Sequence, residues 1–131
     1  MVYFDTSYLC IRWDSEINSV LMEWKSFVFG NDFRQGLNKG LELAREKRAS
    51  RWLADLRKLG VVSQEDQQWS NQDWFPRALA QGIRSMAIVV PENVVAKWSV
   101  ERIMQKAEEQ PLVVTYLASV EEARQWLRST A

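Results

Sequence analysis

Asp55 and Arg57 are the two side chains whose types and spacing come closest to a reactive pair. They stand at the end of an apolar run, and residues two apart in an extended strand share a face. A carboxylate beside a guanidinium could take part in acid–base chemistry, but no other side chain in reach completes such a set. The pattern therefore favours a structural ion pair over a catalytic one.

The chain contains no histidine, and this excludes several classes of catalytic site. Ser-His and Cys-His nucleophilic sites, imidazole acid–base catalysis and nearly all catalytic zinc sites depend on that side chain. Catalysis by carboxylates, lysine or tyrosine stays open, but the sequence gives no positive sign of such a site, so we expect a protein that is not an enzyme and that needs no metal or cofactor.

Ser63 begins a predicted helix shortly after Gly60, where an anion could bind. Amides at a helix N-terminus can hold a phosphate, but a serine at the N-cap already accepts a hydrogen bond from one of them. Glu65 and Asp66 follow in the first turn and would repel a phosphate. The pattern favours capping over an anion site.

Seven tryptophans are unusual in a chain of this size. Trp69, Trp74 and Phe75 crowd residues 69–76, a segment that Asp73 and other breaking residues interrupt. These aromatic side chains could line an apolar pocket or present an aromatic patch to a partner. The simpler interpretation is that they cover the sheet like other core residues. The other tryptophans that we place in the core are Trp13, Trp24, Trp52 and Trp126.

Charge and composition argue against a nucleic-acid partner. The 17 basic and 17 acidic residues give a formal net charge of zero, whereas a nucleic-acid-binding protein normally carries a basic excess. Hydrophobic residues make up 47% and charged residues 26% of the chain, as in an ordinary globular domain. We expect a single domain over residues 1–131.

The cysteine content and the N-terminus predict a cytoplasmic protein. The one cysteine, Cys10, cannot form an internal disulfide, which fits a reducing compartment. The first residues lack the basic and apolar regions of a signal peptide. No stretch approaches the ~20 apolar residues that span a bilayer.

Five apolar runs bounded by breaking residues predict five strands. The runs are residues 8–13, 17–25, 52–56, 85–90 and 112–117. The first two form a β-hairpin, and helices follow the later strands with predicted N-caps at Asn31, Ser63, Asp73 and Ser119. This order predicts an α/β fold, with a mixed, mainly parallel five-stranded sheet, helices packed on it and an N-terminal β-hairpin.

Two details of the predicted helices concern packing. Gly36 and Gly40 lie one turn apart and favour close approach of their helix to the sheet. Residues 94–107 hold two apolar clusters that are out of phase with each other, which predicts a helix break near Ser99. The clusters are Val94, Val95 and Trp98, and then Val100, Ile103, Met104 and Ala107.

Three stretches together resemble a known family. They are residues 52–57 (WLADLR), residues 69–78 (WSNQDWFPRA) and residues 87–91 (AIVVP). In this order and spacing the chain resembles the small stand-alone bacterial proteins grouped as STAS-like or SpoIIAA-like. These are related in fold to anti-sigma-factor antagonists and, more distantly, to the lipid-carrying Sec14 domains. The resemblance implies the fold and assigns no activity.

The chain departs from the antagonists at their phosphorylation motif. They carry an Asp-Ser-Ser-Gly-type sequence at the corresponding helix start, where this chain reads VVSQE over residues 61–65. Ser63 is the only hydroxyl there and occupies the Asp place of the motif. A phosphoserine at a helix N-terminus is electrostatically favourable, but Glu65 and Asp66 would remove much of that gain. The departure argues against a phosphorylation switch.

These observations predict a non-enzymatic regulatory or protein-interaction module, whose partner is another protein or a second copy of the chain in a homodimer. The predicted partner or ligand residues are Asp55, Arg57, Ser63, Trp69, Asp73, Trp74 and Phe75. An alternative is a carrier for a small apolar or lipid-like molecule, held between the sheet and residues 69–76. An enzyme using Asp55 and Arg57 is the third hypothesis.

Overall fold

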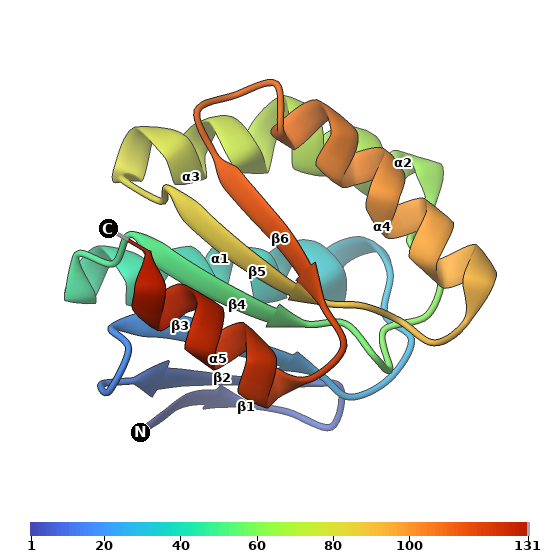
Figure 1. Cartoon of the computed structure of the whole chain (residues 1–131). Helices are drawn as coiled ribbons and strands as arrows, with labels where there is room; N and C mark the ends of the chain where they lie inside the picture. The colour runs from blue at the N-terminus through green and yellow to red at the C-terminus, as the bar shows by residue number, and fades with distance from the viewer. Residues whose placement is uncertain (131) are drawn as a thin grey trace.

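A six-stranded mixed sheet organises the chain (Figure 1). The structure is a computed structural model that describes residues 1–130. The strands are β1 (Val2–Asp5), β2 (Leu9–Asp14), β3 (Ser19–Trp24), β4 (Arg51–Asp55), β5 (Ser85–Val89) and β6 (Val113–Leu117). They lie side by side in chain order, with antiparallel pairing from β1 to β3 and parallel pairing from β3 to β6. This arrangement confirms the predicted α/β fold and the β2–β3 hairpin.

The sheet has one strand more than the sequence predicted. The extra strand is β1, which pairs with β2 at the edge of the sheet. It has four residues and none of them is fully buried. A register shift between Val2 and Phe4 also breaks its alternation. A short edge strand with a bulge produces little of the period-2 pattern that reveals a strand.

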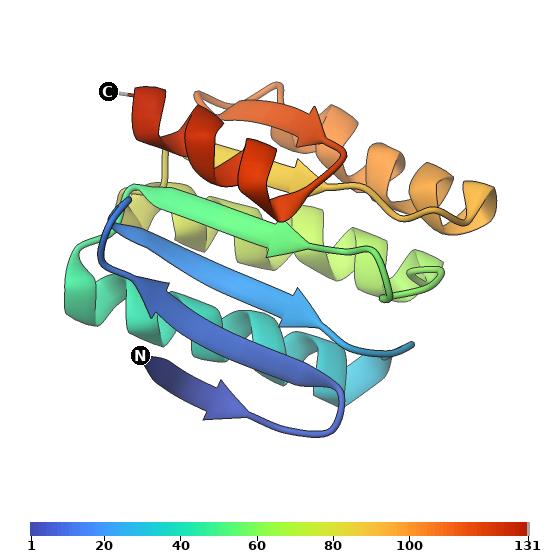
Figure 2. The same ribbon diagram turned by 60° about the horizontal axis from the view of Figure 1, so that its bottom comes forward.

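The helices lie on the two faces of the sheet in unequal number. On one face lie α1 (Gly30–Lys47), α2 (Gln64–Trp69), the π-helical turn η1 (Ser70–Trp74), α3 (Phe75–Gln81) and α4 (Val94–Ala107). Since β3 to β6 add in one direction, crossovers of one hand place all these helices on the same side. Only α5 (Val120–Ser129) covers the other face, against β4, β5 and β6 (Figure 2).

Helix α1 approaches the sheet closely through two glycines, as predicted. A Cβ atom on Gly36 would lie 2.6 Å from a methyl carbon of Leu9. A Cβ atom on Gly40 would collide with the indole ring of Trp52. The helix begins at Gly30, not after the predicted cap Asn31, because the carboxylate of Asp66 accepts a hydrogen bond from the Gly30 amide at 2.9 Å.

Helix α4 runs unbroken from Val94 to Ala107, so the predicted break near Ser99 is wrong. Ser99 is buried and its hydroxyl donates to the carbonyl of Ala96 at 2.7 Å. The same hydroxyl accepts a hydrogen bond from the amide of Val62 at 3.0 Å. Since the second cluster of the helix faces the core, the first cluster must face solvent.

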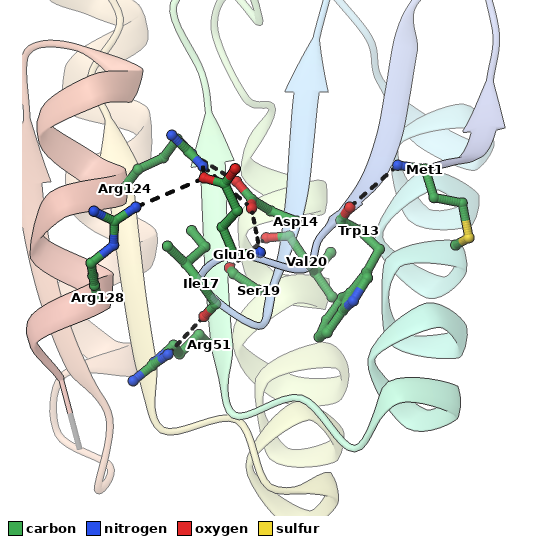
Figure 3. A network of polar contacts seen from close by, with 10 residues as sticks. All are labelled: Met1, Trp13, Asp14, Glu16, Ile17, Ser19, Val20, Arg51, Arg124 and Arg128. Atoms are coloured by element: carbon green, nitrogen blue, oxygen red, sulfur yellow. Dashed lines mark hydrogen bonds and ion pairs between the residues drawn. The ribbon is translucent and has the colours of Figure 1, made fainter.

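A polar network fastens α5 to the turn between β2 and β3 (Figure 3). Arg124 binds the carboxylates of Asp14 at 2.7 Å and Glu16 at 2.8 Å. These hydrogen bonds raise the pKa of Arg124 above its ordinary value. Arg51 donates to the carbonyl oxygens of Ile17 at 2.7 Å and Thr130 at 2.6 Å. The amino ends of β3 and β4 are therefore tied to α5 by internal contacts.

Within residues 1–130, none of the helices has the length and apolar character needed to cross a bilayer.

Candidate functional site

Asp55 and Arg57 form the ion pair that the sequence favoured. Arg57 donates through Nε to Oδ1 of Asp55 at 2.9 Å and through Nη2 to Oδ2 at 2.7 Å. The hydrogen bonds and charge of Asp55 raise the pKa of the Arg57 guanidinium. Glu23, Lys58 and Glu92 share the surrounding hollow of about 220 Å³ at the carboxyl ends of the strands. The carboxylate is buried and bonded twice to its partner, which is the geometry of a structural ion pair.

Ser63 caps α2, as predicted. Its hydroxyl accepts a hydrogen bond from the amide of Asp66 at 3.2 Å. The Asp66 carboxylate is itself buried and faces Arg34, whose Nε lies 3.3 Å away, as well as Gly30. The first turn of α2 thus already holds a carboxylate that ties it to α1, and this supports capping over an anion site.

Trp69 and Asp73 make contacts within the chain. The guanidinium carbons of Arg34 and Arg77 lie 5.4 and 5.9 Å from the centre of the Trp69 ring. Asp73 binds Arg77 at 2.8 Å, and Arg77 also donates to Asn38 on α1. Asp73 is not a helix cap, because helical backbone continues without interruption from Gln64 to Gln81 and Asp73 lies inside η1. These side chains hold η1 and α3 against α1.

Trp74 and Phe75 are core residues, so their prediction as an exposed partner surface is wrong. Their exposed fractions are 1% and 5%. Trp74 packs edge-on against Trp52 at 5.1 Å and against Phe75 at 4.9 Å between ring centres. Its indole N–H donates to the carbonyl of Leu37 at 3.0 Å. The π-helical turn carries both Ser70 and Trp74 onto its buried side, where the simpler sequence interpretation placed the aromatic side chains.

An apolar cavity of about 60 Å³ lies between the sheet and these helices. Its lining includes Trp24, Trp52, Trp74, Phe75, Val100 and Met104. Pockets that hold drug-sized ligands measure roughly 300–1,000 Å³, and an engineered cavity of about 150 Å³ accommodates benzene. A lipid-like molecule therefore does not fit beneath residues 69–76 in this structure, and the cavity gives the carrier hypothesis no support.

The exposed apolar side chains gather elsewhere, on the loops after β3 and β4 and on the first turns of α4, which follow the loop after β5. These loops leave the sheet at the same end, on the right of Figure 1. Six side chains on the first two loops and the first turns of α4 have exposed fractions between 40% and 65%. We call this set the strand-end patch, and its members are Phe27, Phe29, Val61, Val94, Val95 and Trp98.

The strand-end patch is continuous from one loop to the next. The rings of Phe27 and Phe29 lie 5.6 Å apart. Phe27 packs on Gly60, where a Cβ atom would lie 3.1 Å from its ring. Val61 follows Gly60 and lines a hollow of about 260 Å³ together with Val95 and Trp98. We estimate the exposed area of the patch by multiplying each exposed fraction by the area of the whole side chain, which is about 150–250 Å² for an aromatic residue. The sum is on the order of 600 Å².

Sequence reasoning missed this surface although its signals are present. Phe27 and Phe29 flank buried Val28 in a loop, and large aromatic residues are uncommon in a connection. The second signal is the phase difference between the two apolar clusters of α4, which can also be interpreted as a helix break. In one straight helix the same difference places Val94, Val95 and Trp98 outside the core. The residues of the predicted site do not come together: Asp55 and Arg57 lie at the strand ends, and Trp69 and Asp73 lie against α1.

Among residues 1–130, no three histidine, cysteine or carboxylate side chains lie together as metal ligands would.

The comparisons with known proteins agree with the fold. A crystal structure of an uncharacterized protein from the DUF3478 family, from Shewanella loihica PV-4 and with a SpoIIAA-like fold, aligns over 91% of both chains. The TM-score is 0.63 and the sequence identity is 15%, so the likeness concerns the fold alone. A comparison with curated proteins found no match. The sequence model described as SpoIIAA-like matches residues 20–128, and the chain therefore belongs to the SpoIIAA-like family.

Proposed function

We propose that this chain is a non-enzymatic protein-interaction module that binds its partner through the strand-end patch. The observation that carries this proposal is the exposure of six large apolar side chains on two loops and the first turns of α4, all at one end of the sheet. Soluble monomers rarely expose a continuous apolar surface larger than roughly 300–600 Å² without using it. One partner contributes about 800 Å² to a standard protein interface, so this patch and its polar border have a suitable size.

The composition of the patch suits a protein partner. Trp98, Phe27 and Phe29 supply the large aromatic side chains that dominate binding energy in interfaces. Lys58, Glu92 and other polar side chains of the neighbouring loops would form the solvated border of the interface. The patch thus has the apolar centre and polar edge of a contact surface.

The chemistry of the neighbouring groups supports a role without catalysis. Asp55 and Arg57, the nearest charged pair, neutralise each other. Ser63 lines the same hollow as Val61 and Trp98, next to the patch. A partner bound there would cover the hydroxyl of Ser63, so we place the proposed regulatory role at this residue. We also propose a cytoplasmic location, which the single, buried and unpaired Cys10 suits.

The test compares two variants with matched changes. Phe27→Ser/Phe29→Ser/Trp98→Ser alters the patch, whereas Val2→Ser/Val113→Ser alters similarly exposed apolar residues that begin strands at the other end of the sheet. Each protein captured from a lysate is purified and mixed with the purified chain, and the Kd of the resulting two-protein complex is measured. We expect the patch variant to bind at least about 30-fold more weakly, as for loss of one hot spot of 2 kcal/mol.

The control variant should bind within about twofold of the wild type, since isolated surface changes have small effects. Sedimentation of the purified chain tests the same patch with a second copy as partner. Equal Kd values for the wild type and the patch variant, or no stoichiometric partner of either kind, would contradict the proposal. Unchanged circular dichroism and melting of both variants would show that they are folded.

A further inference from the structure

A groove continues from the strand-end patch between α2–η1 and α4. It consists of the hollow beside Trp98 and an adjoining hollow of about 340 Å³. The two share Gln64, Gln67 and Arg102 in their linings. The groove is therefore apolar at one end, where Val95 and Trp98 lie, and polar along the rest of its length.

Carboxamides dominate the polar part of the groove. They are Gln64, Gln67, Gln68, Asn71, Gln72 and Gln105. Within residues 1–130 only Gln67 among them uses its side chain on the protein itself, donating to the carbonyl of Val62 at 2.9 Å. Each carboxamide offers both a donor and an acceptor. A row of free carboxamides is suited to the N–H and C=O groups of an extended peptide backbone, which present the same two functions.

The charged residues of the groove are all basic. Arg102 and Lys106 line it, and none of the lining residues of either hollow is acidic. Neither base forms an ion pair with a residue of the described range 1–130. The surface of the groove is thus complementary to negative charge.

The acidic residues of α4 face a different neighbour. Desolvation, with the charges of Glu108 and Glu101, raises the pKa of Tyr116 on β6 to about 12. These two glutamates therefore lie toward β6, while Arg102, Gln105 and Lys106 lie toward α2 and η1. From Glu101 to Glu108 the acidic side chains thus lie toward β6, and the groove receives only Arg102 and Lys106.

We propose that this groove binds an extended acidic segment of the partner protein, with one apolar side chain of the segment against Trp98. The proposal rests on the function proposed above, because Val61, Val95 and Trp98 belong to both surfaces. Val95 and Lys106 lie about 16 Å apart along α4 at 1.5 Å per residue. About five extended residues cover that distance at ~3.3 Å each. Acidic side chains of the segment bind Arg102 and Lys106, and its backbone binds the carboxamides.

The experiment selects peptides on the purified full chain. A displayed library of random peptides of about ten residues, which span roughly 33 Å when extended, covers the groove with flanking residues. We expect the enriched sequences to combine several Asp or Glu residues with one large apolar residue. A synthetic peptide of the commonest enriched sequence then gives a Kd by fluorescence anisotropy.

Two substitutions on one helix provide the matched comparison. Arg102→Glu reverses a charge inside the groove, and Lys97→Glu makes the same change at an exposed position outside both hollows. Arg102→Glu should weaken the peptide at least about tenfold, since it removes one attraction and adds one repulsion. Lys97→Glu should change the Kd less than about twofold, and added salt should weaken the wild-type complex.

The outcomes separate this inference from the proposed function. Enriched peptides that are basic, or apolar without acidic residues and insensitive to Arg102→Glu, would overturn the acidic-segment inference. Competition by single-stranded DNA or heparin at least as strong as that by polyglutamate would overturn it in favour of a general polyanion site. No enrichment, with partner complexes that still depend on Phe27, Phe29 and Trp98, refutes the inference alone. No enrichment and complexes that survive the patch variant refute both.

Discussion

Substitution of Gly40 by alanine tests whether close packing of α1 on the sheet outweighs helix propensity. In a helix interior, alanine is favoured over glycine by about 1 kcal/mol. In this structure a Cβ atom on Gly40 would strike Cη2 of Trp52, and it would lie 2.8 Å from Cζ2 of Trp52 and 2.9 Å from Sδ of Met22. The two effects oppose each other, so the sign of the change is informative.

The structure favours the steric effect. Trp52 is 1% exposed, and Trp74 packs against its ring in an edge-on contact at 5.1 Å. Overpacking of a well-packed core costs about 1–3 kcal/mol, and contacts this short with a fixed ring place Gly40→Ala near the upper end. After the gain in propensity of about 1 kcal/mol, the net loss should be roughly 2 kcal/mol.

The assay is urea unfolding followed by circular dichroism for a double-mutant cycle. Trp52→Phe removes the outer edge of the indole, including both ring atoms that meet the new methyl group, and leaves only Sδ of Met22, which belongs to a flexible side chain that can move aside. In that background Gly40→Ala should stabilise the protein by about 0.5–1 kcal/mol. The coupling energy between the two positions should therefore be on the order of 3 kcal/mol. The m value, which is the slope of the unfolding free energy against urea concentration, should stay constant among the variants.

A stabilising effect of Gly40→Ala in the wild-type background would refute this reasoning. Additive effects of the two substitutions would refute it as well, because the cost would then arise somewhere other than at Trp52.

Two further substitutions test polar contacts that stabilise the fold, one beside the strand-end patch and one at the opposite end of the sheet. Ser63→Ala removes the N-cap of α2 and should cost about 1 kcal/mol in urea unfolding; Ser63→Asp, which keeps an acceptor, should retain most of that stability, and equal losses would contradict capping. Arg124→Met leaves the largely buried Asp14 without its partner and should cost roughly 1–2 kcal/mol at neutral pH. Burial alone would raise the pKa of Asp14, but the hydrogen bond and charge of Arg124 lower it overall. The stabilisation by Arg124 is then present above the unfolded pKa of Asp14, about 3.9, and disappears as the pH falls through its folded pKa. A difference in unfolding free energy between the wild type and Arg124→Met that stayed constant from pH 7 to pH 3 would therefore contradict this account.

Most of the sheet could be predicted because burial on both faces leaves a plain pattern. Strands β4 and β5 are continuous apolar runs, as expected for parallel strands covered by helices on both sides. Capping at Ser63 and Ser119 was also predictable, since a hydroxyl immediately before a helical run accepts a hydrogen bond from the amide three residues further on. Strand β1 escaped detection because an edge position imposes burial on few of its residues.

The candidate site was less predictable for a physical reason. Apolar residues in a sequence signal burial, and only the three-dimensional arrangement reveals which of them remain exposed. Trp74 and Trp98 have the same side chain, yet their exposed fractions are 1% and 58%. Trp74 is turned inward by the π-helical turn, which has no simple sequence signature. Trp98 is turned outward because α4 does not break at Ser99.

The spatial order of the strands repeats their order in the chain, and this has a consequence for synthesis. A ribosome adds about 5–20 residues per second, whereas two adjacent strands can pair within ~1–10 µs when they form a hairpin. Each strand can therefore join the growing edge before the next one emerges, and no strand has to be inserted between two others. Helix α5 rests on β4, β5 and β6, so it docks last. The hydrogen bond from Arg51 to the carbonyl of Thr130 then joins the start of β4 to the end of α5, so these two elements come together only after α5 has been synthesised.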